Sequence, residues 1–407
     1  MHPALEWLDS LQGSGIRPGL TRMRAMLRAL GDPHRRYPSI IVAGTNGKGS
    51  TAATIASILH VSGYRTGIYT SPHLVSIFER WTIDGEPISE SSLVTAIEAM
   101  HEAADRIGIL PTYFEALTII AFIVFANAGC EIVVLEVGMG GRLDATNVVR
   151  PLASVITPIG FDHMEYLGTT LRQIAGEKAG VIHRGAIVLT SNRDAVVLDV
   201  LRRRAAKFNN HFEVVVPDRN VTSPLAGDFQ RENAALAMRT AERLMPKLPR
   251  ITKDKIAEGV RKTRWRGRLE RLVVEGKEVW VDGCHNAHAA RVIAPFIARN
   301  IAEPRTLVFG IMSDKDVHEV ASLLLPLFNR VITTEPFAPR SAKATDLARL
   351  ASDLGIRSEP VPEPEAGIRR ALDVAEGPIV VAGSLYLAGA AIAFLVALRE
   401  RDREQHR

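Results

Sequence analysis

Residues 44–51 read Gly-Thr-Asn-Gly-Lys-Gly-Ser-Thr, and their types and spacing suit the binding of phosphate groups. Glycines let backbone N–H groups approach a phosphate closely, and the start of a helix favours an anion. A lysine at this place can reach the terminal phosphates of a nucleotide, and a hydroxyl can bind Mg²⁺. The sequence therefore predicts an ATP phosphate loop with contacts from Thr45, Asn46, Gly47, Lys48, Gly49, Ser50 and Thr51.

The segments on either side of this loop favour the same interpretation. Residues 39–43 form an apolar run typical of a buried strand, and residues 52–60 are rich in helix formers. The loop departs from the common G-x-x-x-x-G-K-[ST] pattern, because Val42 occupies the first glycine position and Gly49 directly follows the lysine. The alternative is a glycine-rich turn with a solvated lysine.

Polar side chains are also expected where parallel strands end. Glu136, Ser71 and the pair Asp162-His163 each come at or after the end of an apolar run that predicts a strand. Open α/β sheets bind ligands beyond the carboxyl ends of their strands, and Mg²⁺ prefers oxygen ligands. These residues therefore predict a metal pocket. The alternatives are a structural salt bridge for Glu136, a turn for Ser71 and a structural histidine.

Further groups with possible chemistry lie later in the chain. Residues 138–147 form a glycine-rich, polar loop that suits close approach by a ligand. Lys178 is either a surface residue or a lysine that neutralises charge or becomes chemically modified. In residues 282–288, one cysteine and two histidines lack an obvious fourth zinc ligand, so Asp282 and His285 are instead expected to contact a ligand.

Composition limits the classes of protein to consider. The chain has 407 residues, a mass of 44.5 kDa, 46% hydrophobic residues and a net charge of +5, which is weak support for a nucleic-acid partner. Its two cysteines form no disulfide framework and favour a reducing compartment. The N-terminus does not resemble a signal peptide, and the most apolar windows are shorter than a membrane span. We expect a cytoplasmic protein without a membrane or nucleic-acid partner.

The pattern of elements predicts an α/β fold with two domains. Residues 1–263 are expected to form an ATP-binding domain with a phosphate loop and a mainly parallel sheet. The character of the sequence changes near residue 263, and strands then alternate with helical stretches. Residues 264–407 are therefore expected to form a smaller, Rossmann-like α/β domain. A long apolar helix over 112–128 should begin with a capping box between Thr112 and Glu115.

Several motifs, in order along nearly the whole chain, resemble one enzyme family. The loop at 44–51 resembles the Mur ligase superfamily, whose members join amino acids to carboxylates with ATP. The further motifs resemble dihydrofolate synthase and folylpolyglutamate synthase. They are 70–74, Phe114-Glu115, 138–147, Asp162-His163 with 167–168, 177–181, 267–270, 282–286 and 383–386.

The resemblance implies roles for individual residues. Lys48 and Ser50 would hold phosphates and Mg²⁺, Ser71 and Glu136 a first Mg²⁺, and His163 with Glu136 a second. Lys178 matches a carbamylated lysine, and K⁺ is a further candidate cation. The remaining implied contacts are Asn233, Arg268 and Asp282 for ATP, His285 for glutamate, and Arg22, Arg142, Asp144 and Ala145 for the pterin substrate. Four positions depart from the family pattern, namely Thr21, Arg266, Cys284 and Ala287.

The activity that the resemblance implies is ATP-dependent ligation of L-glutamate to dihydropteroate, to reduced folyl-polyglutamate, or to both. The carboxylate would first form an acyl phosphate, which the glutamate amine would then attack. The enzyme is expected to act as a monomer. The alternatives are a monofunctional folylpolyglutamate synthase, a cell-wall amino-acid ligase and, from another class, a phosphate-loop NTPase switch.

Overall fold

The computed structural model describes residues 2–15, 17–218, 220–336 and 340–405, with side chains through Arg401. The chain divides into two compact units. The first comprises residues 1–72, 78–224 and 230–264, and the second comprises 73–77, 225–229 and 265–407. The last change of unit along the chain comes after Arg264, and the two short segments at 73–77 and 225–229 were not anticipated.

The first unit contains an eight-stranded sheet in the order β4-β3-β2-β5-β1-β6-β7-β8. All neighbours pair in parallel except β2 with β3 and β3 with β4, as expected for a mainly parallel α/β sheet. The strands are β1 (Ser39–Ala43), β2 (Thr66–Tyr69), β3 (Trp81–Ile83), β4 (Glu86–Pro87), β5 (Ile132–Glu136), β6 (Ala153–Ile156), β7 (Ile187–Thr190) and β8 (Phe212–Val214).

The register of this sheet aligns the ends that carry the predicted site. Val42 of β1 pairs with Glu136 of β5, and Tyr69 of β2 pairs with Leu135 of β5. The phosphate loop, Glu136 and the segment that starts at Thr70 therefore leave three adjacent strands at one edge. The three strands are fully buried and largely apolar, as is typical of a parallel sheet.

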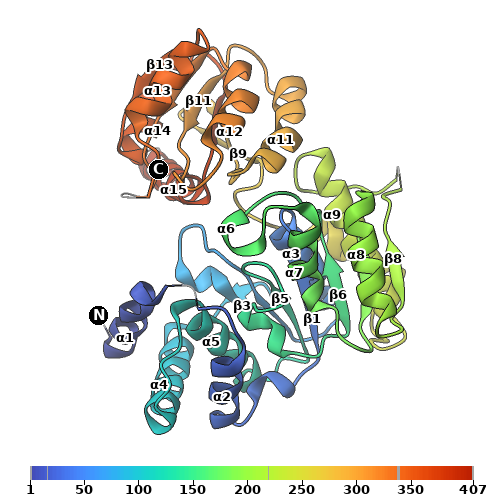
Figure 1. The fold of residues 1–407 in the computed structure, drawn as a ribbon. Helices are drawn as coiled ribbons and strands as arrows, with labels where there is room; N and C mark the ends of the chain where they lie inside the picture. The colour runs from blue at the N-terminus through green and yellow to red at the C-terminus, as the bar shows by residue number, and fades with distance from the viewer. Residues whose placement is uncertain (1, 16, 219, 337–339, 406–407) are drawn as a thin grey trace. The chain divides into compact units, whose positions relative to one another are not determined.

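Figure 1 shows the helices of the first unit around this sheet, with α7 and α8 side by side. Helix α3 contacts β1, β2 and β5 and packs on α10. The helices are α1 (Pro3–Ser10), α2 (Thr21–Ala29), α3 (Lys48–Val61), α4 (Glu90–Ile107), α5 (Tyr113–Asn127), α6 (Met164–Leu167), α7 (Leu171–Lys178), α8 (Ala195–Ala206), α9 (Asp228–Leu244) and α10 (Lys253–Lys262). The short 3₁₀ helices are η1 (Leu11–Ser14), η2 (Pro33–Arg35), η3 (Ile77–Arg80), η4 (Ala145–Val148) and η5 (Ala179–Val181).

Helix α5 illustrates how the sequence specifies one of these elements. The predicted capping box is confirmed, because the Thr112 hydroxyl accepts from the Glu115 N–H and the Glu115 carboxylate accepts from the Thr112 N–H. The helix is apolar on all sides and most of its residues are buried. None of the helices in the described part of the chain has the length and apolar character that a bilayer crossing requires.

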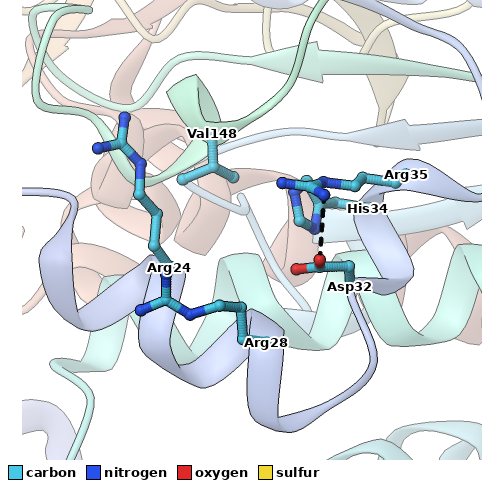
Figure 2. Close-up of a pocket in the computed structure, with 6 residues that line it drawn as sticks. All are labelled: Arg24, Arg28, Asp32, His34, Arg35 and Val148. Atoms are coloured by element: carbon cyan, nitrogen blue, oxygen red, sulfur yellow. Dashed lines mark ion pairs between the residues drawn. The ribbon is translucent and has the colours of Figure 1, made fainter.

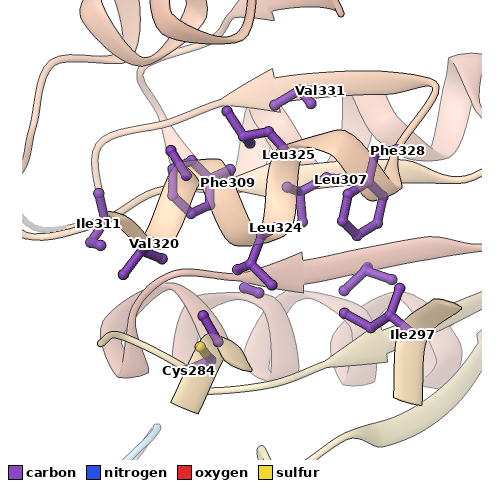
Figure 3. Close-up of a cluster of buried hydrophobic side chains, with 14 of the residues drawn as sticks. Cys284, Ile297, Leu307, Phe309, Ile311, Val320, Leu324, Leu325, Phe328 and Val331 are labelled. Atoms are coloured by element: carbon purple, nitrogen blue, oxygen red, sulfur yellow. The ribbon is translucent and has the colours of Figure 1, made fainter. Parts of the chain in front are cut away.

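The second unit has a six-stranded sheet in the order β13-β12-β11-β14-β10-β9, parallel except between β10 and β9. Its strands are β9 (Glu270–Val274), β10 (Lys277–Val281), β11 (Thr306–Phe309), β12 (Arg330–Thr333), β13 (Arg357–Pro360) and β14 (Ile379–Ala382). Its helices are α11 (Ala287–Asn300), α12 (Val317–Leu324), η6 (Leu325–Leu327), α13 (Ala344–Asp353), α14 (Pro364–Val374) and α15 (Leu385–Gln405). Apolar side chains such as Leu307, Phe309, Leu324 and Ile297 form a buried cluster in this unit (Figure 3).

Candidate active site

The glycines of the phosphate loop are required by the space around them. Gly44 has a φ of +148°, and a Cβ there would lie 1.9 Å from the Thr157 hydroxyl oxygen. Gly47 has a φ of +82°, and a Cβ there would lie 2.4 Å from the Asn233 side-chain oxygen. Side chains rarely adopt such φ values, so only glycine fits both positions. Gly47 is also the N-cap of α3.

The segment after β6 fixes the rest of the loop. The Thr45 N–H donates to the Pro158 carbonyl at 2.9 Å, and the Thr45 hydroxyl donates to the Gly160 carbonyl at 3.0 Å. The Gly160 N–H donates back to that hydroxyl at 3.1 Å. The side chain of Thr45 is therefore used to hold the loop, while its neighbour Asn46 also donates its N–H toward Pro158.

Lys48 begins α3, so its ammonium group lies at the positive end of a helix. The Nζ atom donates to the Thr45 carbonyl at 3.1 Å and therefore folds back over the loop. Ser50 and Thr51 follow in the first turn and are buried, and the Thr51 hydroxyl has no hydrogen-bond partner among the described residues. The Asn233 amide, which contacts Gly47, donates to Gln230 at 3.0 Å.

Glu136 and Ser71 lie together where β5 and β2 end. Glu136 is 5% exposed, and its Oε2 accepts a hydrogen bond from the Ser71 backbone N–H at 3.2 Å. A buried carboxylate is costly unless it is paired or binds a metal. The predicted neighbourhood of these two side chains is thus present, and their roles as metal ligands stay a prediction.

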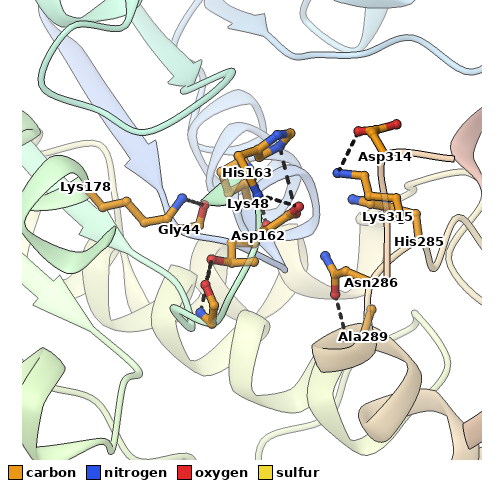
Figure 4. A network of polar contacts seen from close by, with 12 residues as sticks. Gly44, Lys48, Asp162, His163, Lys178, His285, Asn286, Ala289, Asp314 and Lys315 are labelled. Atoms are coloured by element: carbon orange, nitrogen blue, oxygen red, sulfur yellow. Dashed lines mark hydrogen bonds and ion pairs between the residues drawn. The ribbon is translucent and has the colours of Figure 1, made fainter. Parts of the chain in front are cut away.

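Lys178 is a buried lysine beside the loop. Its Nζ donates to the Gly44 carbonyl at 2.7 Å, as Figure 4 shows, and the residue is 3% exposed. Burial, and next the positive charge of Lys48, lower the pKa of Lys178 to about 7, although Asp162 and Asp144 act in the opposite direction. The interpretation of Lys178 as a surface residue is therefore wrong, because the side chain ends inside the site.

The low pKa of Lys178 predicts a pH dependence of stability. From about pH 7 to about pH 10 the unfolded chain binds a proton at this lysine that the folded chain lacks, so stability rises with pH. Lys178→Met removes this contribution. In bicarbonate-free buffer, the unfolding free energy of the wild type should gain up to ~1.4 kcal/mol per pH unit relative to the variant. Urea unfolding at several pH values measures the unfolding free energy of both proteins. The same pH dependence in the wild type and in Lys178→Met would contradict a buried amine with a low pKa.

The pair Asp162-His163 lies further along the segment that holds Thr45. His163 has a φ of +50° and is the N-cap of α6, a helix of four residues. The Asp162 carboxylate accepts from the His163 N–H at 2.9 Å, and the His163 Nε2 lies 3.9 Å from the same carboxylate. This segment bonds to Thr45 through Pro158 and Gly160, and Figure 4 shows Asp162 and His163 near Lys48, so the pair lies in the neighbourhood of the loop.

The donor set at this sheet edge fits Mg²⁺. Ser50, Ser71 and Glu136 offer hydroxyl and carboxylate oxygens, which are the ligands that Mg²⁺ uses together with substrate phosphates. The described residues contain no cluster of three or more His, Cys, Asp or Glu that could hold a metal. One carboxylate and hydroxyls therefore suit Mg²⁺ with ATP better than a metal held by the protein alone.

Glu136→Gln tests the metal role of the buried carboxylate. We expect the Mg²⁺ concentration for half-maximal activity to rise about tenfold or more, because the variant keeps the shape and loses the charge. Activity at fixed Mg²⁺ should fall about a hundredfold, with little change in the unfolding free energy. Glu131→Gln is the matched control, since Glu131 is an exposed carboxylate just before the same strand. An unfolded variant with an unchanged Mg²⁺ response would instead make Glu136 structural.

The glycine-rich loop at 138–147 is organised by Asp144. One carboxylate oxygen accepts from the N–H groups of Gly138 and Met139, and the other accepts from the N–H and hydroxyl of Thr146. Burial raises the pKa of Asp144, and these hydrogen bonds act against the rise. Asp144 thus has a positioning role in the loop, and its neighbour Ala145 is buried.

Two of the predicted substrate residues are arginines in ion pairs. Arg142 is exposed and makes a two-pronged contact with Glu177, at 2.8 Å for the shorter distance. Arg22 pairs with Glu115 at 3.0 Å, so the carboxylate of the α5 capping box also fixes α2. The sequence did not predict this pairing, since the two residues are 93 positions apart.

Gly138 lies against the Phe114 ring, where a Cβ would come within 2.3 Å.

The second unit carries its own group of predicted residues after β10. The Asp282 carboxylate accepts from the N–H groups of Leu269 at 2.9 Å and Cys284 at 2.8 Å. Burial raises the pKa of Asp282, whereas the nearby Arg268 acts in the opposite direction. His285 Nδ1 lies 3.0 Å from the Gly283 carbonyl. Asp282 therefore joins the segment that carries Arg268, before β9, to the loop that carries His285, after β10.

The cysteine of this segment is part of the core. Cys284 is buried in the apolar cluster of Figure 3, and burial raises the pKa of its thiol well above the usual value. A thiol in such surroundings is a poor metal ligand, because ligation requires the thiolate. Asn286 instead caps α11 by accepting from the Ala289 N–H at 2.8 Å (Figure 4). These contacts disfavour the zinc alternative.

Comparison with known proteins identifies the family. Residues 42–215 match the Mur ligase middle domain, and residues 267–385 match the Mur ligase glutamate ligase domain. A Bacillus subtilis dihydrofolate synthase/folylpolyglutamate synthase is 36% identical over 84% of this chain and 87% of its own length.

Solved structures agree over almost the whole chain. The folylpolyglutamate synthase of Thermotoga maritima has a TM-score of 0.85 and 34% identity over 97% of this chain and 96% of its own. Escherichia coli FolC in complex with DHPP and ADP has a TM-score of 0.86 and 28% identity over 98% of both chains. The chain therefore belongs to the dihydrofolate synthase/folylpolyglutamate synthase family of Mur ligases.

Proposed function

We propose that this chain joins L-glutamate to the carboxylate of dihydropteroate and to that of reduced folyl-polyglutamate, with conversion of ATP to ADP and phosphate. The observation that carries the proposal is the phosphate loop at 44–51, with Lys48 at the start of α3 and the buried Lys178 bonded to Gly44. Family membership supports the class of reaction, an ATP-dependent ligation.

The reaction proceeds in two balanced steps. A carboxylate oxygen of the pterin substrate attacks the γ-phosphorus of ATP, and the bond to the ADP oxygen breaks. The glutamate amine then attacks the acyl carbon, phosphate leaves and the nitrogen loses a proton. Both steps move negative charge, so the contribution of the protein is position and electrostatics. Lys48 and the N–H groups of α3 supply fixed positive charge beside the transferred group.

Two Mg²⁺ ions complete this proposal. Ser50, Ser71 and Glu136 would hold one, and His163 with Glu136 the other, with K⁺ as a further candidate cation. Bound Mg²⁺ would offset the charge on the transferring phosphoryl group. Carbamylated Lys178 would add oxygens in place of an ammonium group. Its burial beside Gly44 and its low pKa support this modification, because a neutral amine is the form that reacts with CO₂.

The remaining proposed contacts follow the family resemblance. Asn233, Arg268 and Asp282 would contact ATP, and His285 would place the incoming glutamate. Arg22, Arg142, Asp144 and Ala145 would form the pterin site. In this site Asp144 holds the loop and Glu115 holds Arg22, so both acidic residues act by positioning.

The substrate range can be tested by direct comparison. Glutamate-dependent phosphate release should occur with dihydropteroate as the only pterin and, separately, with tetrahydrofolate. The E. coli FolC complex, described as holding DHPP and ADP, supports the first of these. Turnover with tetrahydrofolate alone would reduce the activity to polyglutamylation. Phosphate release that requires neither pterin nor glutamate would favour an NTPase switch.

We further propose a cytoplasmic monomer that acts on small molecules only, without a nucleic-acid or membrane partner. Both cysteines are free and buried in the described structure, which suits a reducing compartment. Light scattering of the purified protein tests the monomer, and a mass of twice 44.5 kDa would contradict it.

A further inference from the structure

A pocket of about 90 Å³ lies in the first unit between α2 and the segment that enters β1 (Figure 2). This volume is several times the minimum of about 10–15 Å³ that holds one water molecule. Its lining, drawn in Figure 2, consists of Arg24, Arg28, Asp32, His34, Arg35 and Val148. We call it the arginine pocket.

The arginine pocket has an excess of positive charge. Arg35 pairs with Asp32 at 3.2 Å, which uses the one carboxylate of the lining. Arg24 and Arg28 are exposed, and neither has an ion-pair partner among the described residues.

The lining of the arginine pocket also contains a buried histidine. His34 is 7% exposed, and its Nδ1 has no hydrogen-bond partner among the described residues. Its ring lies against Phe122, with 5.6 Å between the centroids. A buried polar atom without a partner costs free energy, so its place in a pocket lined mainly by charged side chains suggests a partner from solution.

The arginine pocket is separate from the phosphate loop. Residues 33–36 lead into the start of β1, and Val148 precedes β6. The phosphate loop instead follows the end of β1. The five residues of β1 span about 17 Å at ~3.3 Å each, so the two features lie at opposite edges of the sheet.

We propose that the arginine pocket binds a phosphate-type anion. Guanidinium groups match the oxygens of such an anion with paired N–H donors, and two of them here lack a protein carboxylate. The small volume and the buried His34 favour one phosphate group over a nucleic acid, which needs an open surface. Two sources share this chemistry: free phosphate, which the proposed reaction releases, and the phosphate group of a metabolite.

The test is a calorimetric titration of Lys48→Ala with inorganic phosphate, because that background weakens the phosphate loop and leaves the arginine pocket intact. We expect one saturable site per chain. Adding Arg24→Gln and Arg28→Gln should weaken binding at least about tenfold, since each arginine supplies charge-assisted hydrogen bonds. Arg261→Gln, at an exposed arginine of α10 in the same unit, is the matched control and should bind as before.

A second variant separates a pocket from a charged surface. Val148→Phe fills the pocket and keeps every charge, so phosphate binding should again weaken. Glycerol 3-phosphate distinguishes the sources: binding as tight as that of phosphate indicates a metabolite, and much weaker binding indicates free phosphate. Equal phosphate binding in all variants, or binding of duplex DNA that Val148→Phe leaves unchanged, would overturn the proposal. The titration measures phosphate binding without turnover, so a failure of the proposed ligase activity would not change its result. The arginine-pocket proposal and the proposed function can therefore fail independently.

Discussion

Lys48→Ala is expected to reduce glutamate-dependent phosphate release by about a hundred- to a thousandfold, a typical loss when one preorganised electrostatic group is removed from an active site. The ammonium group lies at the first residue of α3 and bonds to the Thr45 carbonyl, so the loop holds it in place before substrate binds. The transferred phosphoryl group gathers negative charge beside it. Alanine leaves the loop backbone unchanged and removes this charge.

Two further variants make the Lys48 result specific. Lys48→Arg keeps the charge but changes its shape and reach, so we expect a loss nearly as large. Lys253→Ala, at an exposed lysine of α10, should behave as the wild type. The measurement is phosphate release at saturating ATP, with unfolding curves for each variant. Near-normal turnover of folded Lys48→Ala would contradict the assignment of residues 44–51 as the catalytic phosphate loop.

The glycine loop could be predicted from sequence because residue type reflects its backbone shape. Gly44 and Gly47 have positive φ values that side chains rarely adopt, although the atoms that crowd them, from Thr157 and Asn233, are distant in sequence. The buried strands β1 and β5 were predictable for a similar reason. A short apolar run with β-branched residues has few ways to bury itself other than in a parallel sheet.

The strands that were not predicted are those with weak local signals. Strands β3, β4, β9 and β13 lie at or near the edges of their sheets. Strand β13 reads Arg-Ser-Glu-Pro, which is polar and ends in proline, and β4 has only two residues. Their pairing depends on neighbours that are distant in sequence. Tertiary context, and not local propensity, decides whether such segments form strands.

The sequence indicated which side chains lie near one another at the candidate site, and their roles stay predictions. Glu136 and Ser71 were expected at one sheet edge, because topology alone brings strand ends together. Asp144 was expected to meet the substrate, yet four donors of its own loop occupy its two oxygens. The pairing of Arg22 with Glu115 is likewise invisible in the sequence, since it depends on how α2 packs on α5.

Lys178→Ala is expected to reduce ligation about a hundredfold, and short carboxylic acids such as formate or acetate should restore part of the activity. Lys178 is buried beside Gly44 with a pKa of about 7, so roughly half of the amines are neutral at pH 7 and able to react with CO₂. The resulting carbamate presents two oxygens and a negative charge. Alanine leaves a space that a small carboxylate can enter, with similar oxygens for a cation.

Three measurements decide the Lys178 question. The rescue should saturate with acid concentration in Lys178→Ala and be absent in Lys253→Ala, because only the first variant has a space to fill. Wild-type activity should fall when bicarbonate is removed and recover when it returns. Intact-protein mass in bicarbonate buffer should show one added CO₂ that Lys178→Ala lacks. A wild type that is indifferent to bicarbonate, together with an acid-insensitive variant, would show that the lysine acts as an amine, with its proton donated to the Gly44 carbonyl.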